Sequence, residues 1–171
     1  MPLYTNNTKG TVTHGTGEFD SSIILENDLE VLNSTAYQSA FNINLGKSER
    51  IIFRTFLYFD YNAAGDIKYR ILTPTGTTRF LAVLRQSELP ISGAIVETVT
   101  QYAGSSGTGE VTAAGATGQH FAWVQYGIVE TPGSYASDAS KVLDVQFTQQ
   151  TASDVQATTL KAGSYIEYKK F

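Results

Sequence analysis

The residues of this sequence best suited to metal binding or acid–base catalysis are acidic, and they occur in two groups. Glu26, Asp28 and Glu30 alternate along the chain, so an extended segment directs three carboxylates to one face. Calcium could use that face, with backbone carbonyl oxygens completing its shell. The competing interpretation, which we favour, is a solvated strand face. Asp60 and Asp66 could form a carboxylate pair for sugar cleavage, but that activity would also need aromatic platforms in a cleft, and the strand pattern assigns many aromatic residues to the core.

Groups that could act as a nucleophile, a general base or a metal ligand are few. His14 lies in a polar leading segment and His120 begins an apolar strand, and neither has a second histidine at metal-ligand spacing. A triad that uses His120 would have to assemble across space, and no serine occupies a nucleophile elbow. The chain has no cysteine. We therefore expect no enzymatic activity and no metal site.

Two glycine-containing segments resemble nucleotide-binding motifs only superficially. Gly46-Lys47-Ser48 resembles the end of a phosphate-binding loop, but Phe41 stands where that motif needs a glycine. The segment also joins two strands, so we predict a hairpin turn. The glycines of residues 104–109 are in the wrong order for a dinucleotide fingerprint, and that segment is predicted to be a flexible loop. We expect no cofactor.

The composition narrows the classes of partner. Charged residues make up 16% of the 171 residues, the net charge is −4 and the pI is near 5.1. Binding to DNA or RNA through phosphates requires a cationic face, so nucleic acid is not an expected partner. No apolar run approaches the roughly 20 residues of a membrane span. The segment Met1 to Gly17 lacks the apolar core of a signal peptide, so synthesis in the cytoplasm of the producer is expected.

Apolar residues recur with a period of two along most of the chain. Clear alternation occurs in Gln38–Leu45, Ile67–Ile71 and Leu143–Thr148, which predicts strands with one buried face. Ile51–Tyr61 and Phe121–Val129 are apolar on both faces and predict strands covered on both sides. Turn signals separate these runs; they are Asn62–Gly65, Thr73–Gly76, Leu89–Gly93 and Thr131–Ser134. The pattern predicts an all-β fold, an antiparallel β-sandwich that is jelly-roll-like.

The domain organisation follows from the same pattern. Residues 1–20 are predicted to form a flexible N-terminal arm, and residues 21–171 a single β-sandwich domain. The arm is either a disordered tail or a segment that orders against a neighbouring subunit. In the second case Pro2, Leu3 and Tyr4 are the candidate anchoring residues.

The strands that are apolar on both faces indicate either a subunit interface or a more fully covered position within one chain. For an interface, the candidate residues are Ile52, Phe56, Tyr58, Trp123 and Tyr126. A closed trimer or another cyclic ring would also cover edge strands that otherwise invite aggregation.

Several segments follow one another in a distinctive order between Val31 and Phe171. They are Asn33–Gln38, Asp66–Ile71, the Thr-Pro-x-Gly turn at Thr73–Gly76, Leu143–Gln149, the Lys-Ala-Gly-Ser turn at Lys161–Ser164 and the basic end at Lys169 and Lys170. This order resembles a module of tailed-bacteriophage virion surface proteins, with Asn33–Gln38 as its opening strand. The resemblance implies a trimeric β-sandwich without enzymatic activity.

The resemblance implies a structural protein located in the virion, most simply a capsid decoration protein on the outer head surface. Its partners would then be copies of itself and the major capsid protein or other virion proteins, with no nucleic acid and no membrane. The alternative is a tail-fibre or collar tip that recognises a host glycan or protein, with Tyr102, Tyr126 and Tyr135 as candidate ligand residues. A jelly-roll lectin or carbohydrate-active enzyme is a third possibility, because fold alone does not fix function.

Overall fold

The computed structural model describes residues 9–13, 19–61, 66–89, 96–104, 108–113, 119–134 and 141–171. These residues form strands, turns and irregular connections, and no helix long and apolar enough to cross a membrane occurs among them. The strands of the described residues are β1 (Lys9–Thr13), β2 (Ser21–Leu25), β3 (Leu29–Val31), β4 (Gln38–Asn44), β5 (Arg50–Tyr61), β6 (Ile67–Leu72), β7 (Arg79–Leu89), β8 (Val96–Gly104), β9 (Thr108–Ala113), β10 (Gln119–Glu130), β11 (Val142–Thr148), β12 (Thr158–Leu160) and β13 (Tyr165–Lys170).

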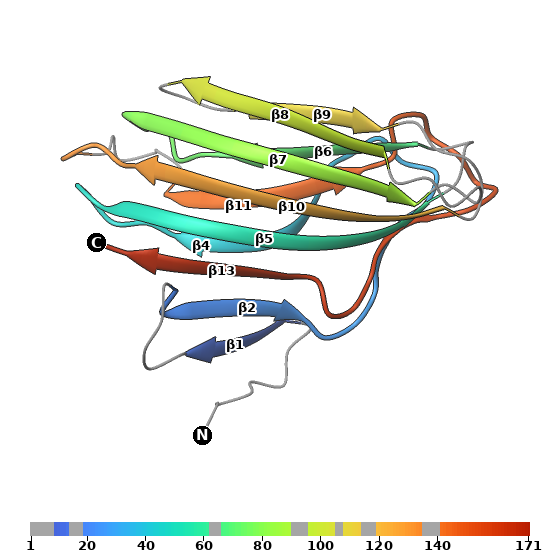
Figure 1. The fold of residues 1–171 in the computed structure, drawn as a ribbon, viewed down its shortest axis with the longest axis horizontal. Coiled ribbons are helices and arrows are strands. Elements are labelled where there is room, and N and C mark those ends of the chain that lie inside the picture. The colour runs from blue at the N-terminus through green and yellow to red at the C-terminus, as the bar shows by residue number, and fades with distance from the viewer. Residues whose placement is uncertain are drawn as a thin grey trace.

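The strands form two antiparallel sheets that pack against each other (Figure 1). The larger sheet has the order β1-β2-β13-β5-β10-β7-β8, and the short strands β12 and β3 extend it beside β5. The smaller sheet has the order β4-β11-β6-β9. The predicted all-β sandwich is therefore confirmed.

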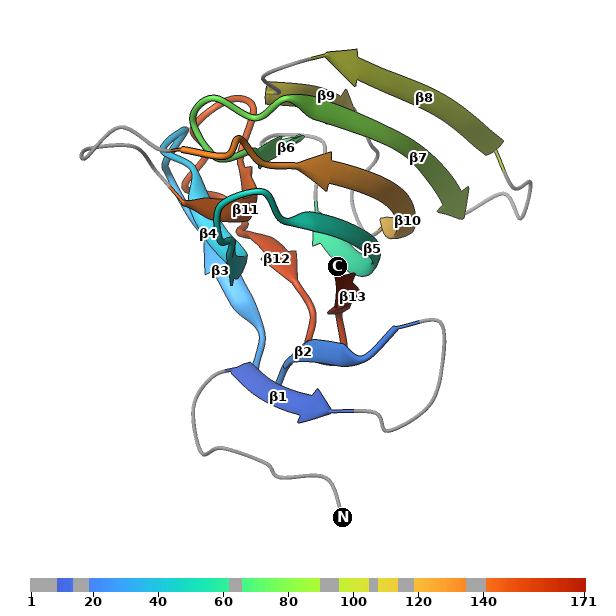
Figure 2. The ribbon, with the colours of Figure 1, turned by 90° about the vertical axis from the view of Figure 1, so that its left-hand side faces the viewer.

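The path of the chain between the sheets is that of a jelly roll. The interrupted strand β2/β3 lies in the larger sheet, β4 in the smaller, β5 in the larger, and β6 and β9 in the smaller. The chain then alternates again through β10, β11 and the interrupted strand β12/β13. The hairpin β7–β8 is inserted between β6 and β9, and it widens the larger sheet beyond β10. Figure 2 shows this hairpin and the β1–β2 pair at opposite ends of the larger sheet.

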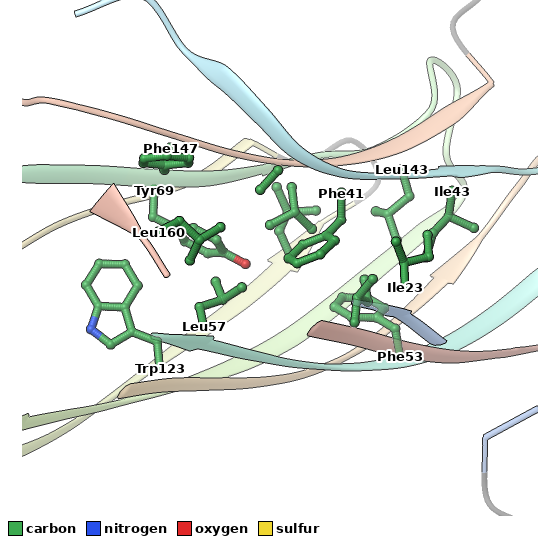
Figure 3. Close-up of a cluster of buried hydrophobic side chains, with 14 of the residues drawn as sticks. Ile23, Phe41, Ile43, Phe53, Leu57, Tyr69, Trp123, Leu143, Phe147 and Leu160 are labelled. Carbon is green, nitrogen blue, oxygen red and sulfur yellow. The ribbon is translucent and has the colours of Figure 1, made fainter. Parts of the chain in front are cut away.

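The core lies between the inner faces of the two sheets (Figure 3). Alternate residues of β5 point inward, so Ile51, Phe53, Leu57 and Phe59 are buried. An aromatic cluster fills one part of the core, in which the ring of Trp123 lies 5.0 Å from Phe59 and 5.6 Å from Tyr69, between centroids. Phe59 in turn lies 5.5 Å from Phe147 of the smaller sheet. These contacts join the two sheets.

Two turns predicted from the sequence have the expected backbone. Gly76 in the Thr-Pro-x-Gly turn has a φ of 78°, and Gly163 in the Lys-Ala-Gly-Ser turn has a φ of 87°. Both angles lie in the left-handed region that glycine adopts without a steric penalty. The second turn separates β12 from β13, and its Ser164 hydroxyl accepts a hydrogen bond from the backbone N–H of Tyr58 (3.0 Å).

Three expectations from the sequence require correction or refinement. Asn33–Gln38 is not an opening strand, because Asn33 has a φ of 50° and β4 begins only at Gln38. Gly46-Lys47-Ser48 is a turn but not a hairpin, because it connects β4 of one sheet to β5 of the other. Within the predicted arm, Lys9–Thr13 forms β1 and pairs with β2 over five residues.

Candidate functional site

The outward-facing side of the larger sheet carries apolar side chains on four adjacent strands. We call it the outer face, and its described members from β13, β5, β10 and β7 in that order are Tyr165, Glu167, Lys169, Arg50, Ile52, Arg54, Phe56, Tyr58, Asp60, Ala122, Val124, Tyr126, Ile128, Glu130, Arg79, Leu81 and Val83. Most of these residues are half-buried, whereas 47% of Tyr126 and 38% of Leu81 are exposed.

The strand register aligns these side chains in rows across the sheet. Ile128 lies opposite Ile52 on one side and Leu81 on the other. One row along, Tyr126 lies between Arg54 and Val83 in the same way. Because the inward positions of β5 and β10 already fill the core, the apolar residues at these outward positions are surplus to the fold of one chain.

An ion pair lies within this apolar surface. The Arg54 guanidinium donates from Nε to Glu167 Oε2 (3.1 Å), and its second hydrogen bond to the same oxygen completes the pair. The hydrogen bond to Glu167 is the main cause that raises the pKa of Arg54, and a hydrogen bond with Tyr126 contributes. The ring of Phe19 lies 5.2 Å from the guanidinium carbon, as in a cation–π contact. Arg54 is thus held in place by its own chain.

The outer side of the smaller sheet is different, because polar side chains are hydrogen-bonded across it. The Ser39 hydroxyl donates to Asp144 Oδ1 (2.6 Å), and Arg70 Nε donates to Gln146 Oε1 (2.7 Å). The guanidinium carbon of Arg70 also lies 3.6 Å from the centroid of the Tyr37 ring. The two outer sides of the sandwich therefore present opposite chemistry, one apolar and one polar.

The residues predicted to form a subunit interface divide between the outer face and the core. Ile52, Phe56, Tyr58 and Tyr126 lie on the outer face. The prediction for Trp123 is wrong, because its side chain is fully buried and packs on Phe59 between the sheets. The period of two itself separates Trp123 from Tyr126, since an odd number of residues along a strand reverses the direction of the side chain.

The three alternating carboxylates are not gathered into one cluster in the structure. The carboxylate of Asp28 accepts hydrogen bonds from the Lys161 ammonium group and from the backbone N–H of Ala162 (2.8 Å). These bonds lower the pKa of Asp28, and the first of them raises the pKa of Lys161. Glu26 and Glu30 are exposed. No group of three or more candidate ligands occurs within the described residues, so Asp28 serves to fasten the turn between β12 and β13.

Several other predicted site residues have no described side chain. Tyr102 belongs to strand β8 and not to a loop, and His120 belongs to β10. The anchoring residues Pro2, Leu3 and Tyr4, together with His14 and Tyr135, lie outside the described residues.

A shallow surface depression lies beside the smaller sheet, where β3 leads into β4. It was not predicted from the sequence, because Asn33–Gln38 was expected to form a strand. Tyr37, which stacks on Arg70, lies at its margin, and Leu32 is 52% exposed. The depression is lined by Glu30, Val31, Leu32, Ser34, Ala36, Tyr37 and Gln38.

Comparisons with known proteins assign this chain to no family. No protein-family model and no curated protein matches the chain. One similar solved structure, described as the structure of infectious bursal disease virus Gx strain, shares 10% sequence identity with a TM-score of 0.20. The match covers 95% of this chain and 40% of the viral chain, so this chain spans less than half the length of the viral chain. A likeness of this size supports no conclusion about fold or function.

Proposed function

We propose that this chain is a non-enzymatic structural protein of a bacteriophage virion, a capsid decoration protein on the outer surface of the head. The observation that carries the proposal is the outer face, an apolar surface of the kind that marks contact between protein subunits. The jelly-roll path is consistent with it, since viral capsid domains commonly use this fold. Lectins and cupins use the fold as well, so the fold alone does not determine the function. The order of strands and turns that resembles phage surface modules adds a second line of support.

In this role the sandwich adds protein–protein contacts to a shell and thereby stabilises it. Burial of apolar surface contributes roughly 25 cal/mol per Å², and the ordering of any arm offsets part of that gain. We propose residues 1–8, with Pro2, Leu3 and Tyr4, as the anchoring segment. Lys9–Thr13 is left out because it already pairs with β2.

The experiment that tests this function is localisation on purified particles. Antibodies raised against the recombinant protein, used with gold labelling on virions released from the producing host, are expected to decorate heads. Mass spectrometry of the same particles should detect the chain in many copies per head. Absence of the protein from purified virions would overturn the proposal. A variant that lacks residues 1–8 is expected to lose binding to capsids while its circular dichroism spectrum stays unchanged.

A second candidate function is a fibre or collar tip that binds a host glycan, and the depression beside Tyr37 favours it. Sugars commonly pack on aromatic rings while side chains nearby satisfy their hydroxyls, and both kinds of group line this depression. Selective binding on a glycan array that is abolished by Tyr37→Ala would support this function. Gold label on tails or fibres in place of heads would also support the fibre-tip function.

A further inference from the structure

The outward positions of β10 between residues 122 and 128 carry no charge, unlike the outward positions of β5 and β13 in the same sheet. Ala122, Val124, Tyr126 and Ile128 follow one another at alternate positions. By contrast, the outward positions of β5 include Arg54, and those of β13 include Glu167 and Lys169. The middle of the outer face is therefore a neutral apolar stripe. It lies beside Arg54 of β5 and ends at Glu130, which forms ion pairs with Arg50 of β5 and Arg79 of β7.

Such a stripe suits a symmetry axis. In a cyclic assembly, the residues nearest the axis contact their own copies in the neighbouring subunits. A charged residue there would face a like charge at short range, which opposes association. Tyr126 and Ile128 carry no such penalty, and Tyr126 has the most exposed large side chain of the stripe.

The charges beside the stripe also fit a second copy of the chain. Arg54 and Glu167 neutralise each other within one copy, so the centre of the surface presents no net charge. Two chains that each carry a net charge of −4 would otherwise repel. A polyanion or an anionic lipid surface would instead require unpaired cations, and Arg54 is already occupied.

We infer that a second copy of this chain covers the outer face, in a cyclic oligomer whose axis lies nearest β10. The inference rests on the proposed structural role, because it names the partner of the same surface. The two are nevertheless tested apart. The mass of the purified protein does not depend on any virion, and labelling of virions does not depend on the number of chains in the oligomer.

The test is the solution mass of the full chain by light scattering, measured over a range of protein concentrations. The wild type is expected to have a mass of at least two chains, in a whole-number multiple of one chain. Tyr126→Lys places a cation in the stripe and is expected to reduce the mass to that of one chain. The matched control is Asn42→Lys, which adds the same charge at an exposed strand position on the polar side of the sandwich. This control is expected to keep the wild-type mass.

A second measurement keeps the inference testable if Tyr126→Lys fails to fold. Because the chain has no cysteine, Tyr126→Cys and Asn42→Cys each introduce a single thiol. A short bis-maleimide is expected to link chains efficiently in the first variant and poorly in the second. A wild type that is one chain in mass at every concentration would overturn the inference. Equal cross-linking of the two variants, or an oligomer that survives Tyr126→Lys, would do the same.

Discussion

The ring of Phe53 on β5 lies directly over Gly127 on β10, its partner in the antiparallel register. A Cβ atom added at position 127 would be 2.2 Å from Cζ of that ring. The absence of a side chain at this position lets a large aromatic residue pack flat against the sheet. At an ordinary strand position, a protein with glycine is less stable than the same protein with alanine by roughly 0.5–1 kcal/mol. At position 127 the steric clash outweighs that difference, so glycine is the more stabilising residue of the two.

Gly127→Ala is therefore expected to destabilise the fold by about 1–3 kcal/mol, the usual cost of overpacking a core. Urea denaturation followed by tryptophan fluorescence measures this, since Trp123 is buried on the same strand. Gly46→Ala is the control, because its Cβ would have no neighbour closer than the flexible Glu49 carboxylate at 3.6 Å. A Gly127→Ala protein as stable as the wild type would show that Phe53 does not hold this position in solution.

The hydroxyl of Tyr69 donates a hydrogen bond to the side-chain carbonyl of Gln125 inside the core. Tyr69→Phe removes the donor and leaves that buried acceptor without it, so we expect a loss of about 1–3 kcal/mol. In the double variant Tyr69→Phe/Gln125→Leu the acceptor is gone as well, and the combined loss should be smaller than the sum of the single losses. Strict additivity of the two changes would contradict this coupling. Tyr168→Phe, at a half-buried position of β13, is the control.

Thr131 fastens the connection between β4 and β5 to the end of β10. Its hydroxyl accepts a hydrogen bond from the Glu49 N–H (2.9 Å) and donates to the carbonyl oxygen of Gly46 (2.7 Å). Thr131→Val keeps the shape but removes both bonds, and we expect a loss of about 1–3 kcal/mol in thermal or urea unfolding. Thr78→Val removes an exposed hydroxyl that bonds the Glu130 carbonyl, and should cost less than about 0.5 kcal/mol. Equal effects of the two substitutions would argue against a special role for Thr131.

The pair of Asp28 and Lys161 makes stability depend on pH. The pKa of Asp28 in the folded protein lies below its ordinary value of 3.8, so the folded state holds its proton less tightly than the unfolded state. The stabilisation is therefore complete above the unfolded pKa and is lost as the pH falls through the folded pKa. The pKa of Lys161 is raised, so a matching loss is expected when the pH rises above 10.5.

Asp28→Asn tests this dependence. Its side-chain oxygen can still accept from Ala162 N–H, but the charge that pairs with Lys161 is gone. Wild type and variant should differ by a small, constant amount in melting temperature near neutral pH, and their curves should converge in acid. Parallel curves down to pH 2 would contradict the assignment. Glu26→Gln is the control, because it removes an exposed carboxylate of the same segment and leaves the contact between Asp28 and Lys161 in place.

The sequence by itself determined the fold class and most of the strands. The alternation in Gln38–Leu45, Ile67–Ile71 and Leu143–Thr148 corresponds to β4, β6 and β11. The two runs that are apolar on both faces correspond to β5 and β10. This works because the period of two is a local property of an extended backbone, so it can be read without knowledge of any partner strand.

Only the tertiary structure decided which strands pair and which apolar face is the inner one. A strand that is apolar on both sides gives no sign of which side meets the core. The period of two shows that Trp123 and Tyr126 point in opposite directions, but only the tertiary structure shows that Trp123 is the one that points inward. The prediction of a hairpin at Gly46–Ser48 was wrong for a related reason. A local turn signal does not reveal whether the next strand joins the same sheet or crosses to the other. Both properties depend on contacts between residues far apart in the chain, such as Phe53 with Gly127 within the larger sheet and Phe59 with Phe147 between the sheets, and no local pattern contains those contacts.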